Sequence, residues 1–296
     1  MIHQLNIHGK DKVQVAIDRL KTFEPSEGYY LAFSGGKDSV VIKALADMAG
    51  VKYDAHMALT SVDPPELIHF VKDTYPDVVF EIPKDKNGKR ITMWNLIPPS
   101  RIPPTRVMRY CCEKLKEFGG NGRMTITGVR WAESPNRRKN QGEITVMKGG
   151  KAQLNELVES GNFSQTPRGG VVLNNDNEES RKMIEQCYRL SKTVVNPIID
   201  WTNEDVWEFI HEYEVPYCRL YDEGYKRIGC IGCPMGSTEH RKAEFERYPK
   251  FKQAYINSFE RMLHYRDDNP GGKEYIQYDW KTGEEVFTWW IGEQKK

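Results

Sequence analysis

Six consecutive residues near the start of the chain have the types that bind a phosphate group: Ser34, Gly35, Gly36, Lys37, Asp38 and Ser39. The two glycines let the backbone approach a ligand, and a helix that begins here presents free N–H groups to an anion. The two serines add hydroxyl donors, the lysine adds a cation, and the aspartate can cap free N–H groups or help place Mg²⁺. A tight turn without a ligand is the structural alternative.

Cysteines form a second group that could do chemistry. The chain has six of them, too few for a disulfide scaffold in a protein of this length. Two close pairs, Cys111-Cys112 and Cys230-Ile231-Gly232-Cys233, are far apart in sequence, as in metal and cluster sites that draw ligands from two loops. Neighbouring side chains on a helix point about 100° apart, so the first pair reaches one centre only in a special turn. Zinc and free redox thiols are the alternatives to an iron–sulfur cluster.

The other two cysteines, Cys187 and Cys218, lie outside these pairs. Buried free thiols that pack like small hydrophobic groups are the default interpretation. Cys218 has the alternative role of a reactive sulfur carrier, since it stands in a loop shortly before the second pair.

Positive charge is concentrated in one part of the chain. From Lys84 to Lys139 there are 14 Lys and Arg against 4 Asp and Glu, whereas the whole chain has a formal net charge of only +1. The segment suits an anionic ligand, such as a nucleic-acid backbone, although a solvated basic face is the plain alternative. Six arginines could take part: Arg101, Arg106, Arg109, Arg130, Arg137 and Arg138.

Hydrophobic periodicity indicates the elements that position these residues. Helical spacing over 13–23 is followed by an apolar strand over 29–33, the glycine-rich residues, and a further helix. Strands over 53–59 and 78–82 flank a helix over 65–75, and another strand covers 124–127. Thr202 as N-cap with Asp205 at N3 predicts the start of a later helix. Strands that alternate with helices predict an α/β fold with a doubly wound parallel sheet.

Two domains are expected: a nucleotide-binding α/β domain over 1–215 and a smaller helical, cysteine-bearing region over 216–296. Residues 140–177 are rich in Gly, Asn, Gln and Ser, which predicts an irregular insertion. Trp289 and Trp290 either stack on bases or, more commonly for paired tryptophans near a terminus, anchor a tail in a core.

The glycine-rich residues 34–39 resemble the Ser-Gly-Gly-x-Asp-Ser signature of the PP-loop ATP pyrophosphatases. Three further blocks resemble the phosphoadenosine phosphosulfate reductase family of that superfamily: Gly128 to Ser134 with Arg137 and Arg138, Asn196 to Trp207, and Leu220 to Cys230. The resemblance runs from about Tyr29 to Pro234. It implies an adenine nucleotide α-hydrolase-like sheet.

The resemblance also implies roles for single residues. Residues 34–39 would hold the phosphates of ATP with Mg²⁺, with Lys37, Asp38 and Arg130 in catalytic roles. Thr60 and Asp63 would lie near the nucleoside, and Gly128 and Arg130 would line the same crevice, at the carboxyl ends of the strands. Asp63 can equally be the residue that starts a helix before two prolines. Substrate-binding roles fall to Glu133, Arg137 and Arg138, and a [4Fe–4S] cluster to Cys111, Cys112, Cys230 and Cys233.

Two departures from the sulfonucleotide reductases define the expected function. Those enzymes carry a catalytic cysteine in a C-terminal motif, and this sequence has no cysteine after Cys233. The glycine-rich residues also keep the form found in enzymes that cleave ATP between the α- and β-phosphates. We therefore expect an ATP pyrophosphatase closer to the DNA phosphorothioation sulfurtransferases, which adenylates an acceptor for sulfur transfer. A sulfonucleotide reductase and a non-catalytic nucleotide-binding or zinc-stabilised module are the alternatives.

Composition fits this expectation. With 39% hydrophobic and 29% charged residues, the chain has the makeup of a globular protein. No apolar run long enough to cross a bilayer and no secretory h-region stands in the sequence, so we expect a cytoplasmic protein without a membrane partner. The expected partners are an adenine nucleotide, a cysteine desulfurase or another persulfide donor, and a nucleic-acid acceptor.

Overall fold

A computed structural model describes residues 11–270 and 278–292 of the chain. Its strands are β1 (Tyr29–Ala32), β2 (Tyr53–Ala58), β3 (Val79–Glu81), β4 (Thr125–Ile126), β5 (Ile144–Lys148), β6 (Phe163–Gln165), β7 (Val171–Leu173) and β8 (Lys192–Val195). Its α-helices are α1 (Lys12–Thr22), α2 (Lys37–Ala49), α3 (Pro65–Thr74), α4 (Met93–Ser100), α5 (Tyr110–Leu115), α6 (Pro135–Asn140), α7 (Lys151–Glu159), α8 (Glu178–Cys187), α9 (Asn203–Glu212), α10 (Thr238–Arg247), α11 (Pro249–Asp268) and α12 (Gly283–Trp290). Short 3₁₀ helices cover Trp131–Glu133 (η1), Tyr188–Leu190 (η2) and Arg219–Tyr221 (η3).

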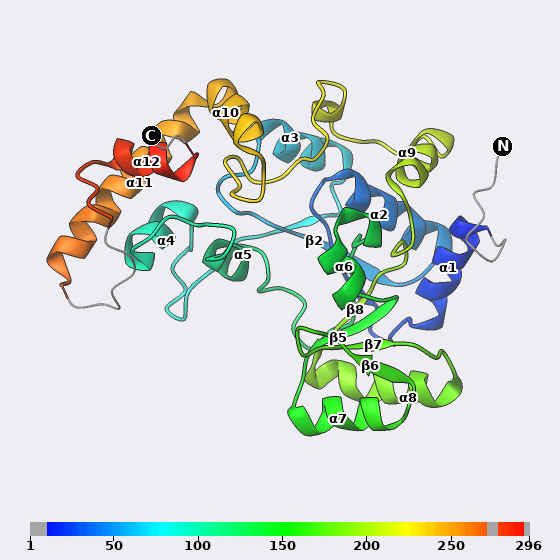
Figure 1. Ribbon diagram of the computed structural model, residues 1–296. Coiled ribbons are helices and arrows are strands. Elements are labelled where there is room, and N and C mark those ends of the chain that lie inside the picture. The colour runs from blue at the N-terminus through cyan, green and yellow to red at the C-terminus, as the bar shows by residue number, and fades with distance from the viewer. Residues whose placement is uncertain (1–10, 271–277, 293–296) are drawn as a thin grey trace. The chain divides into compact units, whose positions relative to one another are not determined.

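The described strands form one sheet in the order β3-β2-β1-β4-β8-β5-β7-β6. Strands β2, β1, β4 and β8 pair in parallel, as crossovers through helices require. Helix α2 packs beside α1 and α9 (Figure 1). The predicted doubly wound α/β class is therefore confirmed, and the helix that follows Thr202 begins with the predicted capping box.

The prediction of an irregular insertion over 140–177 is wrong. This segment contributes β5, β6, β7 and α7, and β5 pairs antiparallel with both β8 and β7. Helix α7 packs against β6 and β7. The strands are short and are joined by turns rich in Gly and Asn. The alternation of apolar and polar residues in each strand is therefore too short to stand out from the polar residues around it.

Two compact units make up the chain. The first unit comprises residues 1–57, 66–80 and 120–227, and the second comprises 58–65, 81–119 and 228–296. This division places the end of the first unit at 227, beyond the predicted domain boundary at 215, and gives the second unit two earlier stretches of chain. The C-terminal region contains the helices α10, α11 and α12, in agreement with its predicted helical character.

Each unit has its own core. In the first unit, Tyr29 and Leu31 of β1 are fully buried. In the second unit an aromatic cluster gathers Phe245, Tyr255, Phe259 and Trp290. The Trp290 indole donates to the Pro104 carbonyl at 2.6 Å, which confirms the anchoring role for that tryptophan.

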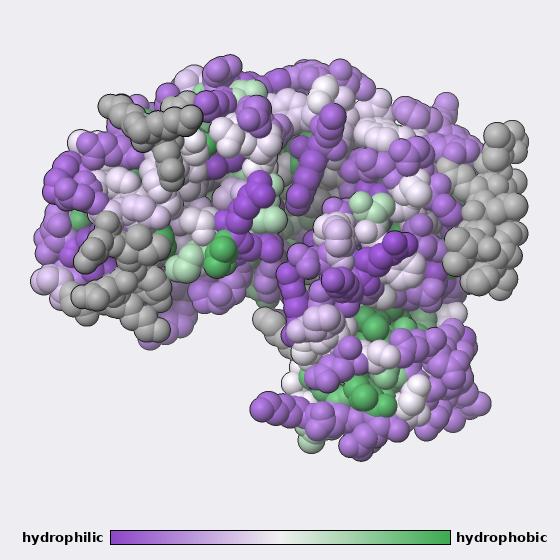
Figure 2. All heavy atoms as spheres, in the orientation of Figure 1, coloured by the Kyte–Doolittle hydropathy of each residue, from purple (hydrophilic) through white to green (hydrophobic). Residues whose placement is uncertain are grey.

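The surface seen in Figure 2 is mostly hydrophilic, with hydrophobic side chains gathered over the region of β5 to β7 and α7. Among the helices of the described residues, none combines the length and apolar character needed to span a bilayer.

Candidate functional site

Residues 34–39, called the glycine turn below, join the end of β1 to the start of α2. Gly35 has a φ of +70°, and a Cβ there would meet Leu67 Cδ1 at 2.7 Å and Val71 Cγ2 at 2.8 Å. Glycine is therefore required by both the left-handed backbone and the packing of α3. Gly36 is the N-cap of α2 and provides no side-chain cap, so the helix begins with an open N-terminus.

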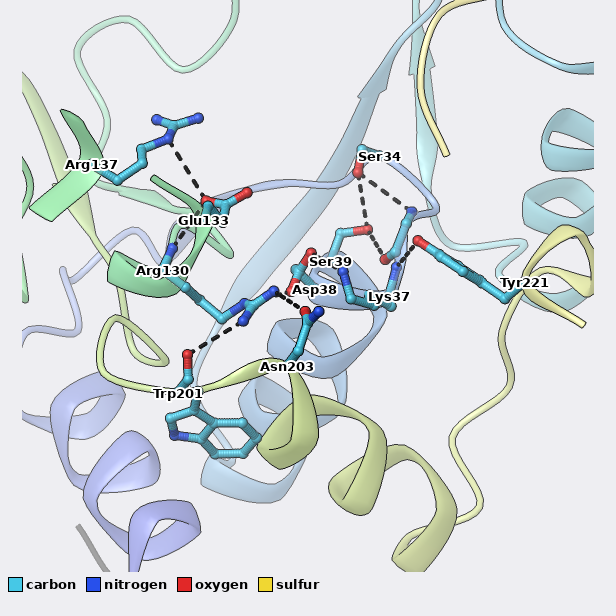
Figure 3. A network of polar contacts seen from close by, with 11 residues as sticks. Ser34, Lys37, Asp38, Ser39, Arg130, Glu133, Arg137, Trp201, Asn203 and Tyr221 are labelled. Atoms are coloured by element: carbon cyan, nitrogen blue, oxygen red, sulfur yellow. Dashed lines mark hydrogen bonds and ion pairs between the residues drawn. The ribbon is translucent and has the colours of Figure 1, made fainter. Parts of the chain in front are cut away.

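Hydroxyl groups brace this turn from within (Figure 3). Ser39 donates to the Gly36 carbonyl at 2.8 Å, and the Gly36 N–H points to Ser34 Oγ at 3.4 Å. The Lys37 N–H donates to the phenol oxygen of Tyr221 at 2.9 Å. Tyr221 therefore occupies one of the N–H groups that a phosphate would use at a helix N-terminus.

Three charges meet at the first turn of α2. The Asp38 carboxylate accepts from Arg130 Nε at 2.7 Å and lies 3.3 Å from Lys37 Nζ. Arg130 is only 2% exposed, and its other nitrogens donate to the Trp201 carbonyl at 3.3 Å and to Asn203 Oδ1 at 3.0 Å. Since its guanidinium is held by protein groups, Arg130 acts on Asp38 and, through it, on Lys37 (Figure 3).

Gly128, at the end of β4, explains how Asp38 and Arg130 come together. A Cβ at Gly128 would lie 2.9 Å from the Asp38 carbonyl oxygen and 3.0 Å from Asp38 Cβ. Only glycine lets the two backbones approach this closely. The structure thus places Gly128 beside the glycine turn. Its role in lining a nucleotide crevice stays a prediction.

The predicted substrate-binding residues follow on η1 and α6. Glu133 accepts from the Arg130 N–H at 3.1 Å and pairs with Arg137 Nε at 3.7 Å. Arg137 and Arg138 are exposed on α6, where an anionic ligand could reach them. Their role in binding stays a prediction.

Thr60 and Asp63 belong to the second unit. Asp63 accepts from the Thr60 N–H at 2.7 Å and from the Thr60 hydroxyl at 2.8 Å, and the Cys230 thiol points to Thr60 Oγ1 at 3.4 Å. Thr60 also accepts from the Val62 N–H at 3.3 Å, and the Asp63 carboxylate acts on Lys116. The proximity of Thr60 and Asp63 to a nucleoside stays a prediction.

Residues 230–233, called the cysteine turn below, are fixed in the second unit by several hydrogen bonds. The Ile231 N–H donates to the Val62 carbonyl at 2.8 Å, and Tyr255 donates to the Ile231 carbonyl at 3.0 Å. The Gly232 N–H donates to the buried carboxylate of Glu244 at 2.9 Å. Gly232 itself has a φ of +71°.

The first cysteine pair lies on helix α5 and not in a special turn, contrary to the prediction. The Cys111 thiol donates to Cys112 and thereby lowers the pKa of Cys112 to about 5, with a further contribution from Arg109. Arg109 donates to Cys112 Sγ at 3.8 Å. The same hydrogen bond, together with burial and the other thiols, raises the pKa of Cys111.

All four thiols lie close enough in the second unit to affect one another electrostatically. Burial raises the pKa of Cys230, whereas the nearby Lys116 opposes that shift, and Cys230 and Asp63 in turn raise the pKa of Lys116. Four thiols with cations beside them are the donor set that iron–sulfur clusters use. As placed, the described residues contain no group of three His, Cys, Asp or Glu side chains that could hold a metal ion. The four cysteines therefore match a cluster in the type of donor atom and in the neighbouring positive charge, and not in a preformed arrangement of ligands.

Cys187 and Cys218 are buried in the first unit, with 4% and 0% of their surface exposed. Burial raises the pKa of each thiol. The default interpretation of packed free thiols is confirmed, and a reactive role for Cys218 is disfavoured because thiolates carry the reactivity.

Sequence reasoning missed the contacts of Tyr221, Lys116 and Glu244. A signal existed for Lys116, which stands four residues after Cys112 on a helical stretch and so falls on the same face. For Tyr221 and Glu244 the partners are remote in sequence, and only the fold brings them together.

Comparison with known proteins gives consistent matches. Residues 28–235 match the phosphoadenosine phosphosulfate reductase domain. An uncharacterized protein of Methanocaldococcus jannaschii is 26% identical over 246 residues, which cover 80% of this chain and 49% of that protein. The adenosine 5'-phosphosulfate reductase of Staphylococcus epidermidis is 26% identical over 253 residues, 78% of this chain and 81% of the reductase. The chain thus spans about half the length of the first relative.

Among solved structures, the phosphoadenylyl-sulfate reductase of Candida auris, in a phosphate complex, aligns with a TM-score of 0.42 and 17% identity over 77% of this chain and 96% of that chain.

Proposed function

Because the chain belongs to the phosphoadenosine phosphosulfate reductase family, we propose that it is a PP-loop ATP pyrophosphatase that adenylates an acceptor for sulfur transfer. Its cofactors in this proposal are ATP with Mg²⁺ and a [4Fe–4S] cluster. The observation that carries the proposal is the charge arrangement at the glycine turn, where Asp38 holds Lys37 at the N-terminus of α2, which Gly36 leaves without a side-chain cap.

The geometry suits cleavage between the α- and β-phosphates of ATP. An acceptor oxygen would attack the α-phosphorus, the bond to the bridging oxygen would break, and pyrophosphate would leave. The helix N-terminus and Lys37 would offset the negative charge that develops on the leaving group. Mg²⁺ bound to the phosphates would add to this effect, as in other phosphoryl-transfer sites.

Arg130 has a positioning role in this proposal. Its guanidinium fixes the Asp38 carboxylate, which leaves Asp38 Oδ2 to orient Lys37. Arg137 and Arg138 are exposed cations that suit the phosphates of a nucleic-acid acceptor.

The four cysteines supply the second half of the proposal. Cys111, Cys112, Cys230 and Cys233 would hold the [4Fe–4S] cluster, which when bound would supply sulfur chemistry at this site. A cysteine desulfurase or another persulfide donor would deliver the sulfur, and a thiol reductant would supply the two electrons that cleave the persulfide S–S bond and release hydrogen sulfide. That sulfide would attack the adenylated acceptor, and AMP would leave. Cys218 is too deeply buried to serve as a carrier.

A sulfonucleotide reductase is the second candidate, since a reductase of Staphylococcus epidermidis is similar over most of its length. Sulfite release from adenosine 5'-phosphosulfate or its 3'-phosphorylated form, with thioredoxin as reductant, would support it. A non-catalytic module is the third, and would show neither iron nor ATP turnover.

The test uses anaerobically purified protein with Mg²⁺, ATP, a persulfide donor, a thiol reductant and either transfer RNA or duplex DNA as acceptor. We expect AMP and pyrophosphate in equal amounts, with sulfur incorporated into the acceptor, and no AMP from the Lys37→Met variant. Sulfite released from a sulfonucleotide, without AMP from ATP, would replace this proposal with the reductase.

A further inference from the structure

Arg241 is a buried cation in the second unit whose hydrogen-bonding capacity is not met. It lies on α10 and is 6% exposed. One terminal nitrogen donates to the Trp290 carbonyl at 2.8 Å, and the guanidinium lies over the Trp290 ring, 4.2 Å from its centroid. Its Nε and its other terminal nitrogen, Nη2, are buried without a hydrogen-bond partner among the described residues.

Such an arrangement needs an explanation in physical terms. A guanidinium stays charged in proteins, and a buried N–H group without an acceptor gives up its hydrogen bonds to water without gaining any in return. Burial lowers the pKa of Arg241, because removal of the guanidinium from water disfavours its charged form. A buried donor without a partner requires an explanation, and for a charged guanidinium that explanation is an anionic acceptor.

Neighbouring groups identify where that ligand lies. Helix α10 follows the cysteine turn directly, and the Gly236 N–H donates to the Cys233 carbonyl at 2.9 Å. A Cβ at Gly236 would touch this carbonyl oxygen at 3.3 Å and Arg241 Cγ at 3.5 Å, so the arginine packs on the chain that leaves Cys233. The Cys233 thiolate is among the charges that act favourably on Arg241.

Other charges nearby do not satisfy Arg241. The Glu244 carboxylate accepts from the Gly232 N–H at 2.9 Å and pairs with His240 at 3.3 Å. Arg106, a like charge, donates to the Pro234 carbonyl at 3.0 Å and to the Gly236 carbonyl at 3.1 Å. The Glu244 carboxylate therefore acts on Arg241 through its charge, but it accepts neither the Nε–H nor the Nη2–H group of the guanidinium.

We propose that Arg241 is a positioning residue of the cysteine site, whose free Nε–H and Nη2–H groups donate hydrogen bonds to a sulfur anion, the Cys233 thiolate or an inorganic sulfide beside it. The proposal rests on the proposed function, because the sulfide belongs to the [4Fe–4S] cluster. It adds a residue that none of the cysteine motifs contains.

The choice of arginine follows from the geometry. A planar guanidinium can stack on Trp290 and still present two forked donors, whereas a lysine ammonium cannot do both. Lysine at this position should keep the charge but lose the paired hydrogen bonds, and glutamine should lose both the charge and the stacked plane.

The experiment compares the anaerobically reconstituted full chain with Arg241→Gln, Arg241→Lys and the control Arg247→Gln. Arg247 is a matched control because it is an exposed arginine of the same helix whose guanidinium also lies over an aromatic ring, that of Tyr248. We measure iron and sulfide per chain, the rate of iron loss to a chelator, and the midpoint potential of the bound cluster. Partners of metal ligands typically contribute 10–100-fold to metal retention, so iron loss from Arg241→Gln should be at least about tenfold faster. Arg241→Lys should be intermediate and Arg247→Gln unchanged.

The potential separates positioning from a structural role. Removal of hydrogen bonds to sulfur lowers the reduction potential of a cluster, so the clusters retained by Arg241→Gln and Arg241→Lys should show a lower midpoint potential than the wild type. Unchanged iron loss and potential in both variants would overturn the assignment while leaving the cluster in place. A wild-type chain that takes up no iron would instead overturn the cluster, and with it this inference.

A different ligand would also show itself. Inorganic phosphate or sulfate that raises the melting temperature of the cluster-free wild type, but not that of Arg241→Gln, would make this an oxyanion site and overturn the sulfur assignment. An equal shift of the melting temperature in the wild type and in Arg241→Gln supports it, because phosphate and sulfate stabilise folded proteins generally. If Arg241→Gln does not fold, Arg241→Lys carries the same comparisons.

Discussion

The glycine turn and the cysteine turn handle charge in opposite ways. At the glycine turn the carboxylate of Asp38 stands between two cations, and the guanidinium of Arg130 has a partner for each nitrogen. At the cysteine turn the guanidinium of Arg241 keeps buried N–H groups without a partner among the described residues. In the first site the charged groups are paired with one another, whereas in the second the guanidinium has two donors that the sulfur anion of our proposal would satisfy.

The largest effect on stability is expected from a substitution that deforms the cysteine turn. In Gly232→Ala the new Cβ would lie 2.4 Å from Phe245 Cζ, at a φ of +71°. Overpacking and the left-handed backbone together should lower the free energy of unfolding by about 3–4 kcal/mol. Urea denaturation measures this loss, and iron uptake should fail with it.

Gly229→Ala is the matched control, because a Cβ there meets nothing within 4 Å. Equal destabilisation by the two variants would show that the geometry of the cysteine turn is not the cause.

The glycine turn is tested through its central charge. Asp38→Asn keeps the shape but leaves the buried Arg130 without its anion, which should lower the free energy of unfolding by about 2–3 kcal/mol, since the carboxylate is partly exposed. Binding of ATP, measured by calorimetry, should be lost because Lys37 is no longer oriented.

The double variant Asp38→Asn/Arg130→Gln distinguishes the two effects. It should recover part of the stability, since the unpaired charge is gone, but none of the nucleotide binding. Recovery of binding would show that Asp38 does not orient Lys37.

A smaller effect is expected at Tyr221, whose phenol accepts from the Lys37 N–H at 2.9 Å. If the phenol stands where a phosphate oxygen binds, Tyr221→Phe removes a competitor for this N–H group. The Kd for ATP should then fall about fivefold, equivalent to about 1 kcal/mol for one hydrogen bond. Weaker binding would instead mean that the phenol donates to the phosphate.

The smallest change in stability is expected on α6. Arg137→Gln/Arg138→Gln removes two exposed cations, so the free energy of unfolding should change by less than about 0.5 kcal/mol. Binding of a nucleic-acid acceptor should weaken, with the slope of log K against log salt reduced by about two. An unchanged slope would remove these arginines from the acceptor site.

The contrast between the sites also explains what could be read from the sequence. The glycine turn is a contiguous sequence signal bounded by an apolar strand and an amphipathic helix. Gly128 also stands in a recognisable motif, directly after a predicted strand. The ion pair of Arg130 with Asp38 joins residues 92 positions apart, so its presence depends on strand order. The sequence therefore predicts Arg130 as a site residue without its positioning role.

Local signals failed where short strands depend on their neighbours. Thr145 pairs with Val194 on one side and Val172 on the other, and neither pairing is encoded near it. Polar turns around these strands suggested an irregular segment. Likewise, the adjacent cysteines 111 and 112 suggested a turn, but α5 is a helix on which one thiol donates to the other.

The discontinuous second unit imposes an order on synthesis. A chain emerges from the ribosome N-terminus first, and the first unit is complete once residue 227 has emerged. Cys111 and Cys112 are made long before Cys230 and Cys233, and α10 follows later still. The nucleotide-binding sheet can therefore form while the first two thiols still await their partners. During that interval the nascent chain carries the first two thiols without the second pair, so oxidants and stray metals can compete for them before the four-cysteine group is complete.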